Sequence, residues 1–250
     1  MHAAADPFAA TLAEVAAVDG WLTPGQARVL WDAAARVPVG GRVVEIGSFR
    51  GRSTIVLSRA AHDGVEVIAI EPHAGTDRGP QEISGYADAA ATDHEVFNAN
   101  LAAAGVAGRV RHVRQFSHDA LAEVAGAADL LYIDGAHRFG PARADIVRWG
   151  ARVTTGGTLV IHDSFSSVGV TLALATTLFT GSSFRYVGRS RSLAEYRRER
   201  LSVRRRCANF GRQLAQLPWF ARNVVIKALI VTRLGRVTKL LGHDPMQWPY

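Results

Sequence analysis

The chain has 250 residues, 48% of them hydrophobic and 20% charged, which excludes a disordered chain and predicts one sizeable domain with a real core. Its one cysteine, Cys207, excludes an intramolecular disulfide and a thiolate zinc cluster, and favours a reducing, cytoplasmic location. The formal net charge of +7 is unevenly distributed. Residues 1–184 hold 14 basic and 19 acidic residues (net −5), whereas residues 185–250 hold 15 basic and 3 acidic residues (net +12), so the basicity belongs to the C-terminal part.

The N-terminal part is expected to be a helical lead-in over residues 1–40. It holds Asp6 and Glu14 before any Lys or Arg, so it lacks the basic start of a signal peptide. Thr23 is a suitable N-cap and Pro24 suits a first helical position, which predicts a helix that ends near Ala35. No run of about 18 uncharged apolar residues follows, so the sequence predicts no membrane span.

Short apolar segments rich in Val and Ile then alternate with helical segments. The predicted strands are Arg42–Ile46, Val65–Ile70, Val110–Val113, Leu130–Ile133 and Thr158–Ile161, and the predicted helices are Arg52–Ala61, His94–Ala104, His118–Ala125 and Pro141–Ala151. Nearly continuous apolar strands are typical of a parallel sheet that is covered on both faces. Residues 1–190 are therefore expected to form one α/β domain, a doubly wound, mostly parallel, Rossmann-like sheet that binds its ligand at the carboxyl ends of the strands. The glycine-rich segment Ala74–Ala87 is long enough to be a lid over such a site.

The strongest motif follows the first predicted strand and reads Glu45-Ile46-Gly47-Ser48-Phe49-Arg50-Gly51-Arg52-Ser53. Its Gly-x-x-x-Gly spacing differs from the three-glycine dinucleotide fingerprint, and no Gly-Lys-Ser/Thr is present for a nucleotide triphosphate. The glycines let the backbone approach a ligand closely. The acidic residue before the turn would repel a pyrophosphate, so it favours a ligand that carries positive charge.

A second carboxylate, Glu71, ends the next predicted strand, where it can accept hydrogen bonds from the two hydroxyls of a ribose. Together the two motifs describe an adenosyl ligand without phosphates, and on these residues the chain resembles the class I S-adenosylmethionine-dependent methyltransferases over about residues 20–180. The resemblance implies that the glycine turn binds the methionine part of the cofactor, that Glu71 binds the ribose, and that residues after the third strand line the adenine. The expected cofactor-binding residues are Glu45, Gly47, Ser48, Gly51, Ser53, Glu71, Ser117 and His118.

Asp134 and His137 follow the fourth predicted strand, and His162 and Asp163 follow the fifth. Because parallel strands end at one edge of a sheet, two carboxylates and two imidazoles are expected to converge there and to suit Mg²⁺ or Mn²⁺. An Asp-x-x-His with an acidic residue 29 positions after the Asp is similar to the metal-dependent sugar O-methyltransferases of macrolide biosynthesis. That resemblance implies that Asp134 and Asp163 bind a divalent metal and that His137 is the general base.

Where those relatives have Glu-Asp, this chain has His162-Asp163, so His162 is a candidate third metal ligand and the number of ligands stays open. Each residue also has a structural interpretation. Asp134 could cap a helix, His137 could lie at a helix start on the surface, and His162 could be a packed, hydrogen-bonded imidazole. Asp145, eight residues after His137, is expected to be structural.

Residues 191–250 are expected to form a basic helical extension. Val225, Ile226, Leu229 and Ile230 give one of its helices a broad apolar face, which favours packing on the catalytic domain or on a second subunit of a homodimer. Contact of this basic face with a membrane surface or an anionic polymer is the alternative. Binding to nucleic acid is not expected, because no recognised motif accompanies the charge.

The sequence thus predicts a metal-assisted O-methyltransferase that acts on a hydroxyl of a sugar or oligosaccharide. A mycobacterial methylmannose polysaccharide is one concrete acceptor. Two alternatives stay open: a metal-dependent O-methyltransferase of small aromatic molecules, and a non-catalytic, methyltransferase-like binding protein attached to a membrane or polymer. S-adenosylmethionine and Mg²⁺ or Mn²⁺ are the expected cofactors.

Overall fold

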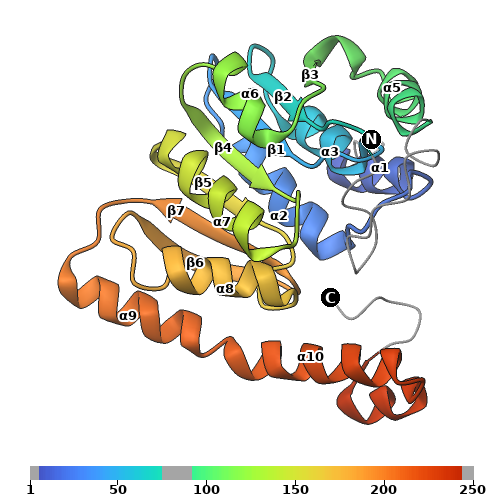
Figure 1. The fold of residues 1–250 in the computed structure, drawn as a ribbon. Coiled ribbons are helices and arrows are strands. Elements are labelled where there is room, and N and C mark those ends of the chain that lie inside the picture. Colours follow the sequence, from blue (N-terminus) through green and yellow to red (C-terminus); the bar gives the residue numbers. More distant parts are fainter. Residues whose placement is uncertain (1–5, 75–91, 244–250) are drawn as a thin grey trace, which may run out of the picture.

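The structure, a computed structural model, describes residues 6–74 and 92–243 (Figure 1). Within these residues, one sheet has the strand order β3-β2-β1-β4-β5-β7-β6. Every neighbouring pair is parallel except those of β7, which runs antiparallel between β5 and β6. The strands are β1 (Arg42–Ile46), β2 (Glu66–Ile70), β3 (Val110–Val113), β4 (Ala128–Ile133), β5 (Val153–Ile161), β6 (Phe184–Ser190) and β7 (Leu193–Arg198).

Helices cover both faces of this sheet, as the apolar strands predicted. They are α1 (Pro7–Val15), α2 (Pro24–Ala35), α3 (Arg52–Ala60), α5 (Asp93–Ala103), α6 (Ser117–Glu123), α7 (Phe139–Arg148), α8 (Val168–Thr177), α9 (Val203–Leu214) and α10 (Leu217–Val231), with 3₁₀-helices η1 (Ala107–Arg109), η2 (Gly150–Arg152) and η3 (Gly235–Leu241). The doubly wound, mostly parallel fold is therefore confirmed, and each predicted strand and helix is present. All of the predicted lid except Ala74 lies outside the described residues.

The alternating direction of side chains along each strand explains why the core has two layers, one on each face of the sheet. On β1, Val44 and Ile46 join a buried cluster with residues of α6, α7 and α8, whereas Val43 joins a second cluster with residues of α1, α2, α3 and α5. Successive side chains of a strand point to opposite faces, so a run of consecutive apolar residues fills both layers. This packing fixes the carboxyl ends of β1, β2, β4 and β5 at a single edge.

The last two strands correct the expected boundary of the basic extension. β7 pairs with β5, from Thr158 opposite Arg197 to Ile161 opposite Ala194, so part of the segment assigned to the extension lies inside the sheet. The helical extension begins at Val203, not at residue 191. The arginines of β6 and β7 hid the strand pattern, because these strands lie near the sheet edge where such side chains reach solvent.

Helices α9 and α10 run end to end along one side of the domain (Figure 1). Asn209 and Gln213 of α9 are buried and hydrogen-bond β6, β7 and the end of α8. By length and composition alone, the combined stretch Val203–Val231 is apolar enough to cross a membrane, with a mean hydropathy of 1.3 over 18 residues, although only 11% of that window is buried. The sequence shows no long uncharged run at this stretch because α10 contains Arg222 and Lys227.

Candidate functional site

The chain reverses its direction across the sheet between β1 and β4, which are neighbours in the sheet although β2 and β3 lie between them in sequence. Such a switch point opens a crevice at the carboxyl ends of the strands. Gly47 follows β1 with φ +88°, and a Cβ at this position would lie 2.2 Å from the carbonyl oxygen of Asp134, which follows β4. Only glycine permits this approach, so the glycine turn and the Asp134 loop are held together.

Glu45 lies beneath this turn rather than on its surface. Its carboxylate is fully buried and accepts hydrogen bonds from the hydroxyls of Ser53 and Thr54 in the first turn of α3 (2.6 Å for Thr54). Burial raises the pKa of Glu45 to about 7 despite these hydrogen bonds. Glu45 and Ser53 thus fasten the start of α3 to β1 and shape the turn from below.

The raised pKa of Glu45 predicts a pH-dependent contribution to stability. A carboxyl whose pKa is higher in the folded protein stabilises fully below its unfolded pKa of 4.5, and this contribution is lost as the pH rises through about 7. Between about pH 5 and pH 8, the wild type should therefore lose about 2–3 kcal/mol more unfolding free energy than Glu45→Gln. Urea denaturation at both pH values measures this difference, and equal losses in the two proteins would contradict the assignment.

The second carboxylate of the predicted cofactor site, Glu71, follows β2 and is partly exposed. It accepts hydrogen bonds from the backbone N–H groups of Phe49 (3.3 Å) and His73 (3.0 Å), which orient it toward the crevice beside the glycine turn. Ser48, within the turn, is buried, and its hydroxyl lacks a partner among the residues that the structure describes. A buried, unpartnered hydroxyl is expected where a bound ligand supplies the missing hydrogen bond.

Three histidines that the sequence left without a role pack beside Glu71. The rings of His73, His94 and His112 lie 5.2–5.5 Å apart, and the Nε2 atom of His112 lies 3.1 Å from the carbonyl oxygen of Glu71. Burial lowers the pKa of His112 to about 4, so this ring is neutral at physiological pH. The three rings form a wall at the β2–β3 side of the site.

The two residues predicted to line the adenine begin α6 and differ in their environments. Ser117 is half-buried, and its hydroxyl donates to Asp145 Oδ1 at 2.6 Å, whereas the ring of His118 is exposed and stacks on Phe116. Burial raises the pKa of Asp145 to about 6, with the Ser117 hydrogen bond opposing the shift. Asp145 thus positions the start of α6, in agreement with the structural role expected for it.

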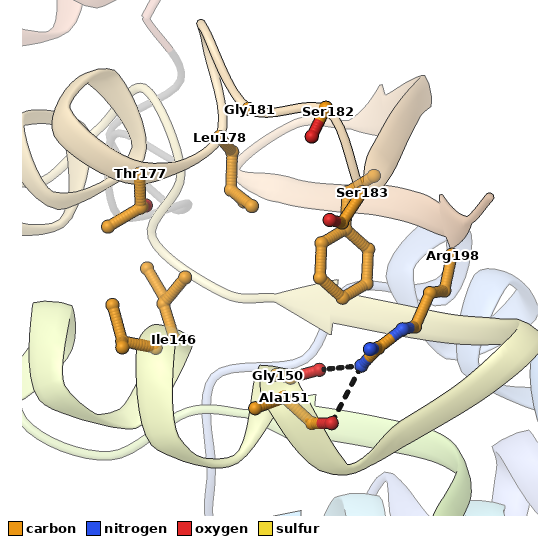
Figure 2. Close-up of a pocket in the computed structure, with 11 residues that line it drawn as sticks. Ile146, Gly150, Ala151, Thr177, Leu178, Gly181, Ser182, Ser183 and Arg198 are labelled. Atoms are coloured by element: carbon orange, nitrogen blue, oxygen red, sulfur yellow. Dashed lines mark hydrogen bonds between the residues drawn. The ribbon is translucent and has the colours of Figure 1, made fainter. Parts of the chain in front are cut away.

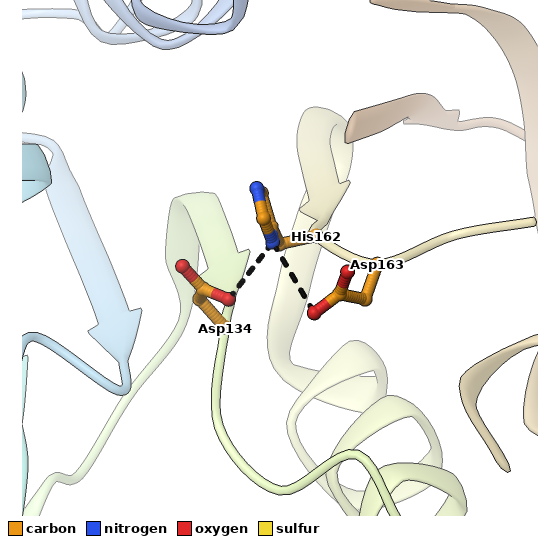
Figure 3. A group of neighbouring side chains, drawn as sticks. All are labelled: Asp134, His162 and Asp163. Carbon is orange, nitrogen blue, oxygen red and sulfur yellow. Dashed lines mark ion pairs between the residues drawn. The ribbon is translucent and has the colours of Figure 1, made fainter. Parts of the chain in front are cut away.

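The predicted metal ligands form one cluster at the ends of β4 and β5 (Figure 3). One candidate ligand atom from each of Asp134, His162 and Asp163 lies within 4.8 Å of the other two. The Nδ1 atom of His162 lies 3.2 Å from Asp134 Oδ1 and 3.5 Å from Asp163 Oδ2. Asp134 is further oriented by the hydroxyl of buried Tyr132, which donates to Oδ2 at 2.7 Å.

His137 joins this cluster from the loop before α7. Its Nε2 atom lies 2.7 Å from Asp163 Oδ2. Burial lowers the pKa of His137, but the charge of Asp163 and its hydrogen bond outweigh this, so the pKa is raised overall. Burial would raise the pKa of Asp163, but the imidazoles of His137 and His162 hold it well below its usual range. Asp163 is therefore a carboxylate at neutral pH, and His137 is an imidazole with increased basicity.

Sequence reasoning missed a residue on the far side of His162. The buried side-chain amide of Gln26 lies with its nitrogen 3.3 Å from His162 Nε2, and its oxygen accepts the backbone N–H of Thr23 (2.9 Å) in a capping box. Because the Thr23 N–H fixes the orientation of the amide, Nε2 of His162 faces a donor and acts as an acceptor. The ring proton therefore lies on Nδ1 and points toward the two carboxylates. The Thr23-x-x-Gln26 pattern signals the capping box, but no local pattern shows the contact with His162.

The donor atoms of this cluster suit a divalent cation. Asp163 Oδ1 is buried and lacks a hydrogen-bond partner among the described residues, although the side chain is ionised. A buried carboxylate oxygen without a partner is costly unless a cation or ligand approaches it. The two carboxylates are also the type of donor that Mg²⁺ and Mn²⁺ prefer.

A cavity of about 260 Å³ lies elsewhere, between the ends of α7 and α8 and the start of β6 (Figure 2). Its lining is mostly apolar and small, and Arg198 borders it while donating to the carbonyl oxygens of Gly150 (2.7 Å) and Ala151 (2.8 Å). Gly150 and Ala151 precede β5, whereas His162 and Asp163 follow it. The cavity is therefore at the opposite end of the sheet and is no part of the site.

Comparison with known proteins places this geometry in context. Residues 44–164, from β1 to the loop after β5, match the family model described as a methyltransferase domain. Among solved structures, the chain is similar to cofactor-bound Rv0187 from MTB, with 24% identity and a TM-score of 0.57 over 78% of this chain and 91% of that one. It is also similar to the O-methyltransferase NovP (16% identity, TM-score 0.56, 71% of this chain and 81% of that one). A third similar structure is a protein from Corynebacterium glutamicum (13% identity, TM-score 0.56, 81% of this chain and 94% of that one).

Proposed function

Because residues 44–164 match a methyltransferase domain, we propose that the chain is a class I S-adenosylmethionine-dependent methyltransferase that methylates a hydroxyl oxygen of a sugar or oligosaccharide with the help of a divalent cation. One observation carries this proposal: Asp134, His137 and Asp163 meet within a few ångströms at the same sheet edge as the Gly47 turn. An acceptor hydroxyl in this position would have a methyl donor on one side and acid–base groups on the other. The likeness to NovP, an O-methyltransferase, supports oxygen as the atom that is methylated.

The cofactor would lie across the ends of β1 and β2. Glu71 would accept hydrogen bonds from the ribose hydroxyls, and the buried hydroxyl of Ser48 and the backbone from Gly47 to Gly51 would hold the methionine part. Ser117 and His118, at the start of α6, would border the adenine. When bound, S-adenosylmethionine supplies a methyl group already activated by its sulfonium. Glu45 contributes from below, because its hydrogen bonds to α3 fix the turn.

Asp134 and Asp163 are the residues that would hold the cation. Asp163 offers the unpartnered Oδ1, and Asp134 offers Oδ1, the oxygen that Tyr132 does not occupy. His162 presents Nδ1 to the same point, but ligation would require this atom to lose the proton that the contact with Gln26 favours there. We therefore assign His162 mainly to orienting the two carboxylates. When bound, a divalent cation lowers the pKa of a hydroxyl that it contacts.

His137 would take up the proton of the acceptor hydroxyl. Its ring is held by Asp163, which fixes its orientation and stabilises the imidazolium that forms. Its backbone is held as well, because Ser167 donates to the carbonyl oxygen of His137 (3.2 Å) and Gly169 of α8 packs against the same carbonyl so closely that a Cβ would lie at 2.2 Å. Orientation of the base and the reacting atoms is the main contribution of the protein to the rate.

An acceptor screen with labelled methyl donor tests the proposal. The full chain should transfer label from S-adenosylmethionine to at least one of a panel of mono- and oligosaccharides that includes mannosides, and a parallel panel of catechols and other small aromatics should stay unlabelled. Label on aromatics alone would replace the sugar with a phenolic acceptor. Calorimetry that detects no binding of S-adenosylmethionine even at about millimolar concentration would remove the cofactor assignment and, with it, the enzyme.

A further inference from the structure

Helix α10 and the 3₁₀-helix η3 have an inner face that packs on the domain. Ile226 and Asn223 are buried, and Asn223 donates to the carbonyl oxygen of Phe165 (3.2 Å) in the loop that follows β5. Lys227 also turns inward, where its Nζ donates to the carbonyl oxygen of Ser166 at 3.1 Å. These contacts confirm that one side of the extension covers the domain, and they support the loop that carries Asp163.

The outer face of the same segment is apolar and uncovered. Val225 is 49% exposed and Val231 is 74% exposed, although both belong to the most hydrophobic helix of the extension. In η3, residues three apart lie above one another, because a 3₁₀-helix has three residues per turn. Its exposed apolar edge consists of Leu234 at the N-cap, Val237 and Leu240, with exposed fractions of 54%, 42% and 86%.

Basic residues accompany the apolar edge: Arg236 and Lys239 lie one residue before Val237 and Leu240 in η3, and Arg233 precedes the helix. All three basic residues are exposed. From residue 200 to residue 243 the sequence contains ten Arg and Lys residues and no Asp or Glu, so nothing within this segment neutralises them. The segment therefore presents hydrophobic side chains and uncompensated positive charge side by side.

We propose that the outer face of α10 and η3 docks the protein on an anionic membrane surface. A lipid surface satisfies both kinds of side chain at once, since the acyl boundary takes up the apolar side chains while anionic headgroups pair with the basic ones. A second copy of the chain would bring the same positive charge against itself across a two-fold interface. A nucleic acid would pair with the arginines but would leave the leucines and valines against a charged backbone.

Docking on the surface, rather than spanning the bilayer, fits the contacts of α10. Crossing the membrane would strip Asn223 and Lys227 from the loop after β5 and Ile226 from its buried position, whereas lying on the surface leaves all three in place. Crossing the membrane would also place the charges of Arg222 and Lys227 in the hydrocarbon core. The inner face therefore anchors the helix to the domain, and the outer face is left for the lipid.

Co-sedimentation of the full chain with vesicles tests the proposal. Vesicles of phosphatidylcholine with about one third phosphatidylglycerol should bind the wild type at least about tenfold more tightly than pure phosphatidylcholine, and salt should weaken the binding. The triple variant L234S/V237S/L240S should lose at least about tenfold in affinity. The triple variant R233Q/R236Q/K239Q should show a smaller preference for the anionic vesicles than the wild type does. A control, V39S/V168S/L172S, removes side chains that are similarly exposed elsewhere and should bind as the wild type does.

Circular dichroism melting of each variant separates loss of binding from loss of folding. If the L234S/V237S/L240S protein melts as the wild type does yet still binds anionic vesicles equally well, the proposal is overturned. Absence of vesicle binding by the wild type also overturns it. A wild-type dimer that becomes monomeric in this variant, without vesicle binding, would instead identify a second copy as the occupant. Binding to single-stranded nucleic acid but not to vesicles would likewise replace the lipid.

Discussion

Replacing His137 with alanine is expected to slow methyl transfer by about 10²–10⁴-fold and to leave the affinity for S-adenosylmethionine unchanged. The ring lies at the β4–β5 end of the crevice, 2.7 Å from Asp163, whereas the predicted ribose contact, Glu71, belongs to β2. The variant should therefore lose the proton acceptor without losing the cofactor site. Turnover with the acceptor found by the screen, together with calorimetric titration of the cofactor, measures the two effects separately.

A matched control uses a histidine outside the site. His62 is exposed, and its Nε2 atom lies 3.0 Å from the carbonyl oxygen of Ala35, far along the chain from His137 and Asp163, so His62→Ala should keep wild-type turnover. A second variant, His137→Gln, retains a polar side chain of similar length but cannot act as a base, so it should be as slow as His137→Ala. Turnover close to that of the wild type in either His137 variant would eliminate this residue as the base.

Replacing Gly47 with alanine is expected to give the largest loss of stability among the glycine positions of the site. The left-handed φ of +88° costs a non-glycine residue about 1–2 kcal/mol. The new Cβ would also lie 2.2 Å from the carbonyl oxygen of Asp134, and relief of such an overlap costs about 1–3 kcal/mol more. The free energy of unfolding should therefore fall by about 2–5 kcal/mol, and cofactor binding should weaken because the turn moves away from Asp134.

Gly40→Ala is the control for backbone strain alone. Gly40 has a similar φ of +80°, but nothing lies within 4 Å of a Cβ built there. Its variant should lose only the conformational part, about 1–2 kcal/mol, and should bind the cofactor as the wild type does. Urea denaturation of both proteins isolates the cost of the close approach, and equal losses would show that β1 and β4 do not constrain each other through this glycine.

Local sequence patterns were sufficient to predict the central sheet and the position of the site. The strands β1 to β5 are short, apolar and separated by helical segments, and the residues after them carry the polar groups, so parallel pairing alone brings Asp134 and Asp163 together. Their geometric convergence is confirmed by the structure, whereas their roles in binding a metal stay a prediction. The same holds for Glu71 and the glycine turn, whose places beside the crevice follow from strand ends.

Long-range contacts account for what the sequence did not reveal. Glu45 was expected to face the ligand, but the side chains of Ser53 and Thr54, in the first turn of α3, draw it under the glycine turn. Gln26 reaches His162 across 136 positions of sequence, which no periodicity predicts. β7 joins the sheet although arginine and glutamate interrupt its apolar pattern, because it pairs with β5 from Ala194 to Arg197.

The C-terminal helical extension also depends on contacts that local sequence patterns do not reveal. Its composition predicts a helix with an apolar face and positive charge, and the structure confirms helices there. Which apolar residues are covered depends on where the domain lies, and the domain covers Ile226 while Val225 beside it stays exposed. Removal of the whole extension after residue 185 would also remove β6 and β7 from the sheet, so point variants are the appropriate tests of its role.

Binding of Mn²⁺ to the protein saturated with S-adenosylhomocysteine, followed through the electron paramagnetic resonance signal of free Mn²⁺, tests the proposed site most directly. Wild-type protein should remove Mn²⁺ from solution at one site per chain, EDTA should reverse this, and Asp163→Asn should abolish it because the buried ligand oxygen loses its charge. Glu14→Gln, a change at an exposed carboxylate remote from the cluster, should bind as the wild type does. Equal Mn²⁺ binding by wild type and Asp163→Asn, or none by the wild type, would contradict a cation held between Asp134 and Asp163.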